Sequence, residues 1–179
     1  MTISHLERVG APSVEPVTLT EAKDYLRVDE VDDDTLITNL ISAARKSAEN
    51  YMKRSLITQS WKVAFDDYSP SYIRLPMGAV QSVTSLKIIA RDGTETLIDA
   101  AKYYLVAAKN RLVVDTPLIG HRVEVIYVAG FGDNASDVPE EIRQGLLNHI
   151  AYIYENRGES LGINHQSKSL YDHYRVIAI

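Results

Sequence analysis

The sequence predicts an α+β protein: a helical module, made of N-terminal helices and a C-terminal helix, with an inserted antiparallel β-sheet domain and a flexible C-terminal tail. Apolar residues recur with helical spacing over residues 16–56 and again over residues 137–158. Between these segments, residues 57–132 contain short runs in which apolar and polar side chains alternate, separated by Gly, Pro or Asn. The length of 179 residues suits about one domain with an appendage.

The N-terminal part of the chain predicts an arm followed by a short helix. Residues 1–15 mix polar side chains with Gly and Pro, and we expect them to form a flexible arm. Thr18 and Glu21 have the spacing of a capping box, in which each side chain accepts a hydrogen bond from the other residue's backbone amide. Apolar residues of one face follow, so a helix is expected over residues 19–28.

A second, longer helix follows an acidic run between Asp29 and Asp34. Its apolar spacing extends from Leu36 to Met52, and Asp33 or Asp34 is placed to cap its positive N-terminal end. The acidic run does not contain the glycine that a calcium-binding EF-hand loop requires at its sixth position. We therefore interpret this run as a solvated turn that begins the helix.

The central residues alternate with the period of two that is typical of half-buried strands. The strands are expected at residues 61–66, 72–76, 82–90, 96–106, 111–115 and 122–131. The strongest hairpin signal is Asp92 followed by Gly93, because a tight turn needs positive φ angles. Short strands at this spacing favour an antiparallel sheet or a small barrel over βαβ units.

A closing helix is expected over residues 137–158. Pro139 suits a first helical turn, the two glutamates that follow suit the positive end of the helix, and Gly158 occupies a position where helices commonly end. Because helical segments flank the strands in the chain, we expect them to pack together, with the sheet as an insertion. Residues 159–179 mix Gly, Ser, Asn and Lys before an apolar end, and we expect a flexible tail.

Composition excludes several classes of protein. The chain has no cysteine, which excludes disulfides, iron–sulfur clusters, thiolate zinc sites and cysteine nucleophiles. Its formal charge of −5 argues against binding nucleic acid by neutralising phosphates. No apolar run approaches the ~18 residues of a membrane helix, and the N-terminus lacks the apolar core of a secretory signal, so we expect a cytoplasmic protein that binds no membrane. The chain has eleven tyrosines, a residue type enriched in protein interfaces.

The residues offer little catalytic chemistry. None of the five histidines belongs to a His-x-x-x-His pair, and we predict no metal or cofactor site. His149 lies on the apolar stripe of the closing helix, where a core or interface histidine is the simpler interpretation. Gly130 and Gly132 lack the third glycine of a dinucleotide loop, and neither a nucleophile elbow nor a phosphate loop occurs. This pattern favours a role in binding or assembly and predicts that the protein is not an enzyme.

Several segments of the chain occur in a recognisable order. Residues 16–28 read Pro-Val-Thr-Leu-Thr-Glu-Ala-Lys-Asp-Tyr-Leu-Arg-Val. Further segments are residues 34, 36–37, 41–45, 49, 54–56, 58–61, 75–78, 80–83, 127–132, 138–139 and 154–158. In this order the chain resembles the head–tail connector proteins of tailed bacteriophages and gene transfer agents. It departs from them at residues 116–118, where a Trp-Pro-like turn is expected, and at residues 170–175, where relatives end on Pro-Tyr-Arg.

The resemblance implies a non-enzymatic adaptor that forms a ring, commonly of twelve subunits, below the portal protein of a filled capsid. Such a ring extends the DNA channel, lets DNA pass without specific binding, and provides a platform for a stopper or tail-completion protein. It lies in the neck of the virion and is assembled in the cytoplasm of the bacterial host. A negatively charged subunit suits a bore through which DNA slides. Ring closure requires two different patches on each subunit.

We expect the contact residues of such an adaptor in the tail and in both parts of the chain. The tail is expected to dock onto the portal or a neighbouring subunit through Leu170, Tyr171, Tyr174, Arg175, Val176, Ile177 and Ile179. Contacts between subunits are expected at the exposed charges Arg45, Lys46 and Glu49 of the long helix, and at Tyr103 and Tyr104.

Two other classes of function stay open on the sequence alone. One is a small acid–base enzyme that uses carboxylates of the β domain with His121 as a general acid–base, and a deep cleft with perturbed titratable groups would favour it. The other is a regulatory nucleic-acid-binding protein, which retention on DNA at ~0.15 M salt with a steep salt dependence would favour.

Overall fold

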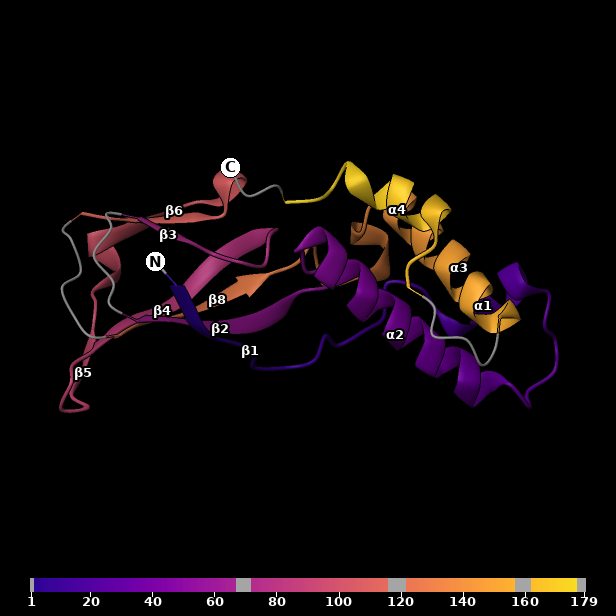
Figure 1. Ribbon diagram of the computed structural model, residues 1–179, viewed down its shortest axis with the longest axis horizontal. Coiled ribbons are helices and arrows are strands. Elements are labelled where there is room, and N and C mark those ends of the chain that lie inside the picture. Colours follow the sequence, from indigo (N-terminus) through magenta and orange to yellow (C-terminus); the bar gives the residue numbers. More distant parts are fainter. Residues whose placement is uncertain (1, 67–71, 116–121, 157–161, 177–179) are drawn as a thin grey trace. The chain divides into compact units, whose positions relative to one another are not determined.

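The computed structural model describes residues 2–66, 72–115, 122–156 and 162–176. Over these residues the chain forms α-helices and two antiparallel sheets, which is the α+β class that the sequence predicts. The chain divides into two compact units (Figure 1). The β unit comprises residues 1–12 and 58–130, and the helical unit comprises residues 13–57 and 131–179.

The β unit contains one five-stranded and one three-stranded sheet. The larger sheet has the strand order β1 (Thr2–Arg8), β2 (Gln59–Asp66), β8 (Arg122–Ala129), β4 (Val80–Ile89) and β5 (Glu95–Leu97). The smaller sheet has the order β3 (Tyr72–Arg74), β7 (Arg111–Val114) and β6 (Tyr103–Val106). Alternate residues of the larger sheet, such as Val63 and Val125, share one buried core with Ile73 and Leu112 of the smaller sheet.

The N-terminal residues differ from the expected flexible arm. Thr2–Arg8 forms β1, which pairs antiparallel with β2, and the Val9 N–H extends the pairing by a hydrogen bond of 2.9 Å to the Ser60 carbonyl. The pairing register shifts between Ile3 and His5. Because of this irregularity, the strict alternation that marks a strand is missing from the sequence, and the mixture of polar side chains with Gly and Pro predicted a flexible arm instead.

The hairpin predicted at Asp92 and Gly93 is present, and it joins β4 to β5 with a φ of +86° at Gly93. The single strand predicted over residues 96–106 is wrong, because its two ends belong to different sheets. A short 3₁₀ turn, Ala100–Lys102, separates β5 from β6. Asp99 caps this turn by accepting a hydrogen bond of 2.9 Å from the Ala101 N–H, which redirects the chain.

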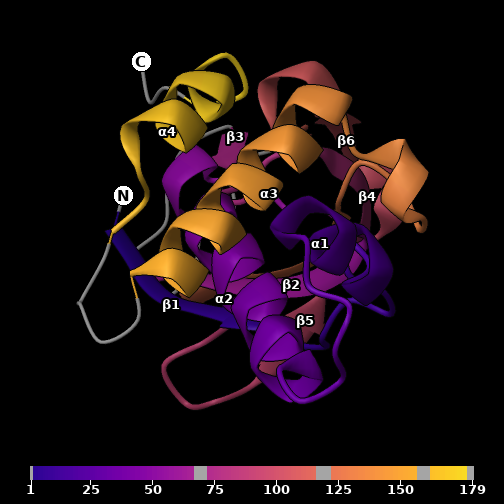
Figure 2. The same cartoon turned by 90° about the vertical axis from the view of Figure 1, so that its right-hand side faces the viewer.

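The helical unit contains α1 (Leu19–Leu26), α2 (Asp34–Met52), α3 (Glu140–Glu155) and α4 (His165–Asp172). Figure 2 shows α1, α2 and α4 gathered around α3, and contacts join α3 to each of them. The core lies between α2 and α3, where Ile37, Ile41 and Met52 meet Ile142 and Leu146. Within the described residues, no helix has the length and apolarity needed to span a membrane.

Local signals place the helix boundaries. The predicted capping box is present, since Thr18 accepts from the Glu21 N–H at 3.2 Å and Glu21 accepts from the Thr18 N–H at 2.8 Å. Asp33 is the N-cap residue of α2, but its side chain makes no capping hydrogen bond and instead accepts from the Tyr154 hydroxyl. The closing helix α3 ends at Glu155, three residues before the predicted end, and Gly158 lies outside the described residues.

Candidate assembly surfaces

The C-terminal segment of the described chain is part of the helical unit and differs from the expected flexible tail. Tyr171 of α4 is fully buried, and its ring packs against α3 at Gly145, where a Cβ would lie 2.5 Å from Tyr171 Cε1. The Ser167 hydroxyl donates to the Gly145 carbonyl at 2.8 Å. The glycine therefore allows α4 to approach α3 closely. A glycine on the apolar face of a helical pattern was the signal for this approach in the sequence.

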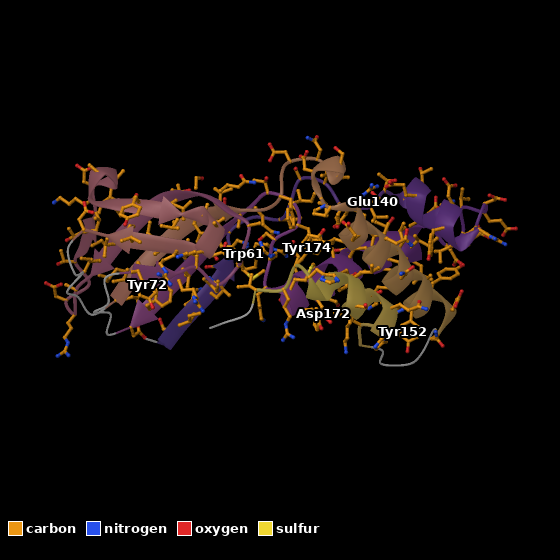
Figure 3. All side chains as sticks on the ribbon, turned by 90° about the horizontal axis from the view of Figure 1, so that it is seen from above. Trp61, Tyr72, Glu140, Tyr152, Asp172 and Tyr174 are labelled. Atoms are coloured by element: carbon orange, nitrogen blue, oxygen red, sulfur yellow. The ribbon has the colours of Figure 1, made fainter. Side chains whose placement is uncertain are left out.

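The end of α4 and the residues that follow it are held by further contacts with α2, with Arg54 just after α2, and with α3. The Val176 N–H donates to the Met52 carbonyl at 2.9 Å, and the Arg54 guanidinium donates to the Tyr174 carbonyl. The Tyr174 hydroxyl donates to Glu141 at 2.9 Å, while Tyr51 donates to Asp172 at 2.6 Å. Figure 3 labels Asp172 and Tyr174 on this segment. These backbone and side-chain hydrogen bonds order the segment up to residue 176.

These contacts change the set of predicted docking residues. Tyr171 is an internal core residue of the isolated chain, so its ring is not available to a partner. Leu170, Tyr174 and Val176 are half-buried, and Arg175 is exposed. Ile177 and Ile179 lie outside the described residues.

The prediction that Arg45 and Glu49 are exposed charges is wrong. Both side chains are 3–4% exposed. Arg45 donates to Glu15 at 2.6 and 3.2 Å and to Glu49 at 3.1 Å, and Glu49 also accepts the Leu56 N–H at 3.0 Å. Residues 13–17, which precede α1, bring Glu15 over this side of α2, and a single-helix pattern cannot show that cover. Lys46 is exposed as predicted.

A second ion-pair network ties α3 to α1 and to the residues just before it. Arg143 donates to the Pro16 carbonyl at 3.1 Å, to Glu140 at 2.7 Å and to Glu21. Burial acts to raise the pKa of Glu21, but hydrogen bonds from Thr18 and the charge of Arg143 outweigh it and leave the pKa below its ordinary value. Glu21 is therefore a charged structural residue that serves both the capping box and the ion pair.

The exposed apolar side chains of the β unit lie near the edges of its sheets. Ile3 and Leu6 of β1 are 43% and 39% exposed, and Leu97 of β5 is 66% exposed. Of the two tyrosines predicted as interface residues, Tyr104 is 56% exposed, while Tyr103 is half-buried and packs against the core. These residues are available for contacts with other chains.

Ionisable groups of the described residues serve the fold where they are buried. No group of three or more His, Asp and Glu side chains among those residues is arranged to hold a metal ion. His149 of α3 is 1% exposed, its ring nitrogens have no hydrogen-bond partner among the described residues, and burial lowers its pKa. This agrees with its interpretation as a core histidine. His121, the general acid–base of the alternative enzyme hypothesis, lies outside the described residues.

The fold and these surfaces define a class of protein: an α+β protein of two units. Its buried charged side chains form ion pairs within the fold, and the exposed apolar and aromatic side chains of its β unit lie near strand edges. Residues 16–95 match the model of a family described as phage gp6-like head-tail connector protein. A search among curated protein sequences gave no match.

Three solved structures share nearly the whole fold. A chain from the neck of an empty gene transfer agent particle, computed with C6 symmetry, is 24% identical with a TM-score of 0.83, covering 98% of this chain and 97% of that one. A chain from the virion of a native gene transfer agent particle is 24% identical with a TM-score of 0.80, covering 97% and 96%. A chain from the neck of a native particle, computed with C12 symmetry, is 25% identical with a TM-score of 0.79, covering 98% and 97%.

These findings confirm the resemblance to head–tail connector proteins that the sequence predicts. The family match covers residues 16–95, and the shared fold covers nearly all of the chain.

Proposed function

We propose that this chain is the head–tail connector adaptor of a tailed phage or gene transfer agent. It forms a ring below the portal protein, extends the DNA channel, and provides the platform to which a stopper or tail-completion protein attaches. The observation that carries this proposal is the agreement of two comparisons: a connector family matches residues 16–95, and chains from particle necks share the fold over 98% of the chain.

The symmetry of the related necks and the charge of this chain both support a ring around DNA. The two neck structures were computed with C6 and C12 symmetry, which fits a ring of twelve subunits. The net charge of −5 is repeated in every subunit of such a ring, so the assembly repels phosphates and favours sliding over specific binding. The protein then resides in the neck of the virion after assembly in the host cytoplasm.

The role is structural and involves no catalysis. The buried carboxylate of Glu49 accepts from Arg45, and the partly exposed carboxylate of Glu21 accepts from Arg143; such ion pairs suit a rigid building block. The proposed contacts with the portal or a neighbouring subunit lie at the C-terminal end, at Leu170, Tyr174, Arg175 and Val176 together with Ile177 and Ile179.

The test is reconstitution with heads that contain DNA and a portal but lack this protein. Purified chain is mixed with such heads, and the portal vertex is imaged by electron microscopy. We expect a ring of added density at the vertex and restored attachment of tails. Bare vertices, or particles that join their necks normally without the protein, would contradict the proposal.

A matched variant separates the tail contact from the fold. A chain that stops after Val176 lacks residues 177–179 but keeps the hydrogen bond from Val176 to Met52. We expect it to fold normally and to bind heads more weakly than the full chain. Retention of the full chain on DNA at ~0.15 M salt would instead favour the nucleic-acid-binding alternative.

A further inference from the structure

Strand β1 presents an apolar surface that its own unit leaves uncovered. In the antiparallel pairing with β2, Ile3 lies opposite Phe65 and Leu6 lies opposite Val63. Residues that lie directly opposite share one face of a sheet, so Ile3 and Leu6 lie on the face that carries the buried core. Phe65 and Val63 are fully buried, whereas Ile3 and Leu6 are 43% and 39% exposed. The core face therefore continues onto β1 without cover.

The outer side of β1 is also open to pairing. β1 stands at the end of the strand order, so its outer backbone groups have no strand partner among the described residues. Proteins usually protect such edges with proline, inward-pointing charge or a very short strand. β1 has seven residues and no proline. Its core-facing side carries Ile3 and Leu6, and the one charge on that side is Arg8, at the end of the strand opposite Trp61. Val9, which follows the strand, is 56% exposed, but the alternation of side chains places it on the face opposite to Leu6.

The opposite edge of the same sheet carries a groove. The edge strand β5 has three residues and pairs with the far end of β4, at Lys87–Ile89, so the first half of β4 is not covered by it. A groove of about 470 Å³ lies there, lined by residues that include Thr84, Ser85, Leu97, Ile98 and Tyr103. The lining also includes Asp99, opposite in charge to Arg8 at the end of β1.

We propose that β1 of one copy of this chain docks into the β4–β5 groove of the next copy. The incoming strand continues the sheet through backbone hydrogen bonds, and Ile3 and Leu6 contribute apolar contact area beside Leu97 and Tyr103. The two edges differ and lie at opposite ends of one sheet. The contact is therefore head-to-tail, which is the type that propagates around a ring. This inference rests on the proposed ring and names the surface through which its subunits join.

Engineered cysteines test the contact without background, because the chain has no cysteine of its own. The first double variant carries Leu6→Cys on β1 and Leu97→Cys in the groove. The second double variant carries Leu6→Cys and Thr84→Cys. Each is exposed to mild oxidant in concentrated solution and in assembled particles, and products are separated on a denaturing non-reducing gel. The controls are the single variants, their equimolar mixture, and Leu6→Cys combined with Val31→Cys, a position 72% exposed in the helical unit.

We expect a ladder of covalent oligomers from a double variant, dimers alone from the mixture of single variants, and no ladder from the Val31 control. Dimers from Leu6→Cys alone, with no ladder, would mean that β1 pairs with β1 and would overturn the head-to-tail contact. Absence of any ladder in both settings, or an equal ladder from the Val31 control, would also overturn it. Particles that contain the protein but give no ladder would leave the connector function standing and reject this contact.

Discussion

The Tyr171 ring lies directly against the Cα of Gly145, so that a Cβ on this glycine would come within 2.5 Å of the ring. This approach holds the C-terminal segment on the helical unit, together with the hydrogen bond from Ser167 to the Gly145 carbonyl. A segment that resembles a docking tail in the sequence is thereby part of the helical unit up to residue 176, with Tyr171 in its core.

Gly145→Ala should destabilise the helical unit. Overpacking against the buried Tyr171 ring costs about 1–3 kcal/mol, and the better helix propensity of alanine offsets roughly 1 kcal/mol of this. We expect a lower urea midpoint in far-UV circular dichroism. Gly162→Ala is the matched control, because open space surrounds Gly162, and it should leave the midpoint unchanged. An alanine variant at 145 as stable as the native chain would show that α4 moves away from α3 without cost.

Arg45→Met should lower the free energy of unfolding of the helical unit by about 3 kcal/mol, since it leaves the buried Glu49 carboxylate without its cation. The value lies at the low end for a buried pair because Glu15, the other partner, is 32% exposed and can be solvated. The neighbouring variant Lys46→Met removes an exposed charge of the same helix and should have little effect. Equal effects of the two variants in urea denaturation would contradict the burial of the Arg45 network.

The helical unit should become less stable as the pH is lowered below about 6.5, because of His149. Burial lowers its pKa in the folded state, whereas the unfolded chain has the ordinary pKa of ~6.5. Between these two values the unfolded state binds more protons, so stability is complete above the unfolded pKa and is lost as the pH falls toward the folded one. Urea midpoints measured at a series of pH values should show this slope. His149→Leu should reduce it, and an unchanged slope would assign the effect to other groups.

Tyr127→Phe should destabilise the β unit by about 1–2 kcal/mol. The Tyr127 hydroxyl is buried and accepts the Met77 N–H at 3.2 Å, and phenylalanine would leave this amide unsatisfied. Fluorescence of Trp61, the one tryptophan of the chain, reports unfolding of this unit. Tyr104→Phe changes an exposed tyrosine of the same unit and serves as control. Coincident unfolding curves of the two variants would contradict the role of the hydroxyl.

Elements that depend on neighbouring residues were predictable from the sequence. The capping box at Thr18 and Glu21, the apolar periodicity of α2 and the Asp92–Gly93 turn each involve residues a few positions apart, and all three are present. The ordered segments that resemble connector proteins were also readable, because such patterns are properties of the linear chain. These features together determined the α+β class and the resemblance.

Tertiary structure alone decided which surfaces are free. Glu15 covers Arg45 from 30 positions away, Gly145 receives Tyr171, and β1 joins the sheet beside a strand that starts some 50 residues later. In each pair, the sequence around one residue gives no sign of the other, because burial depends on the tertiary contacts that the folded chain makes. From the sequence, the charged face of α2 and the polar N-terminal residues are therefore both expected to be exposed to solvent. In the folded chain, Glu15 covers the charged face, and the N-terminal residues pair with β2 as strand β1.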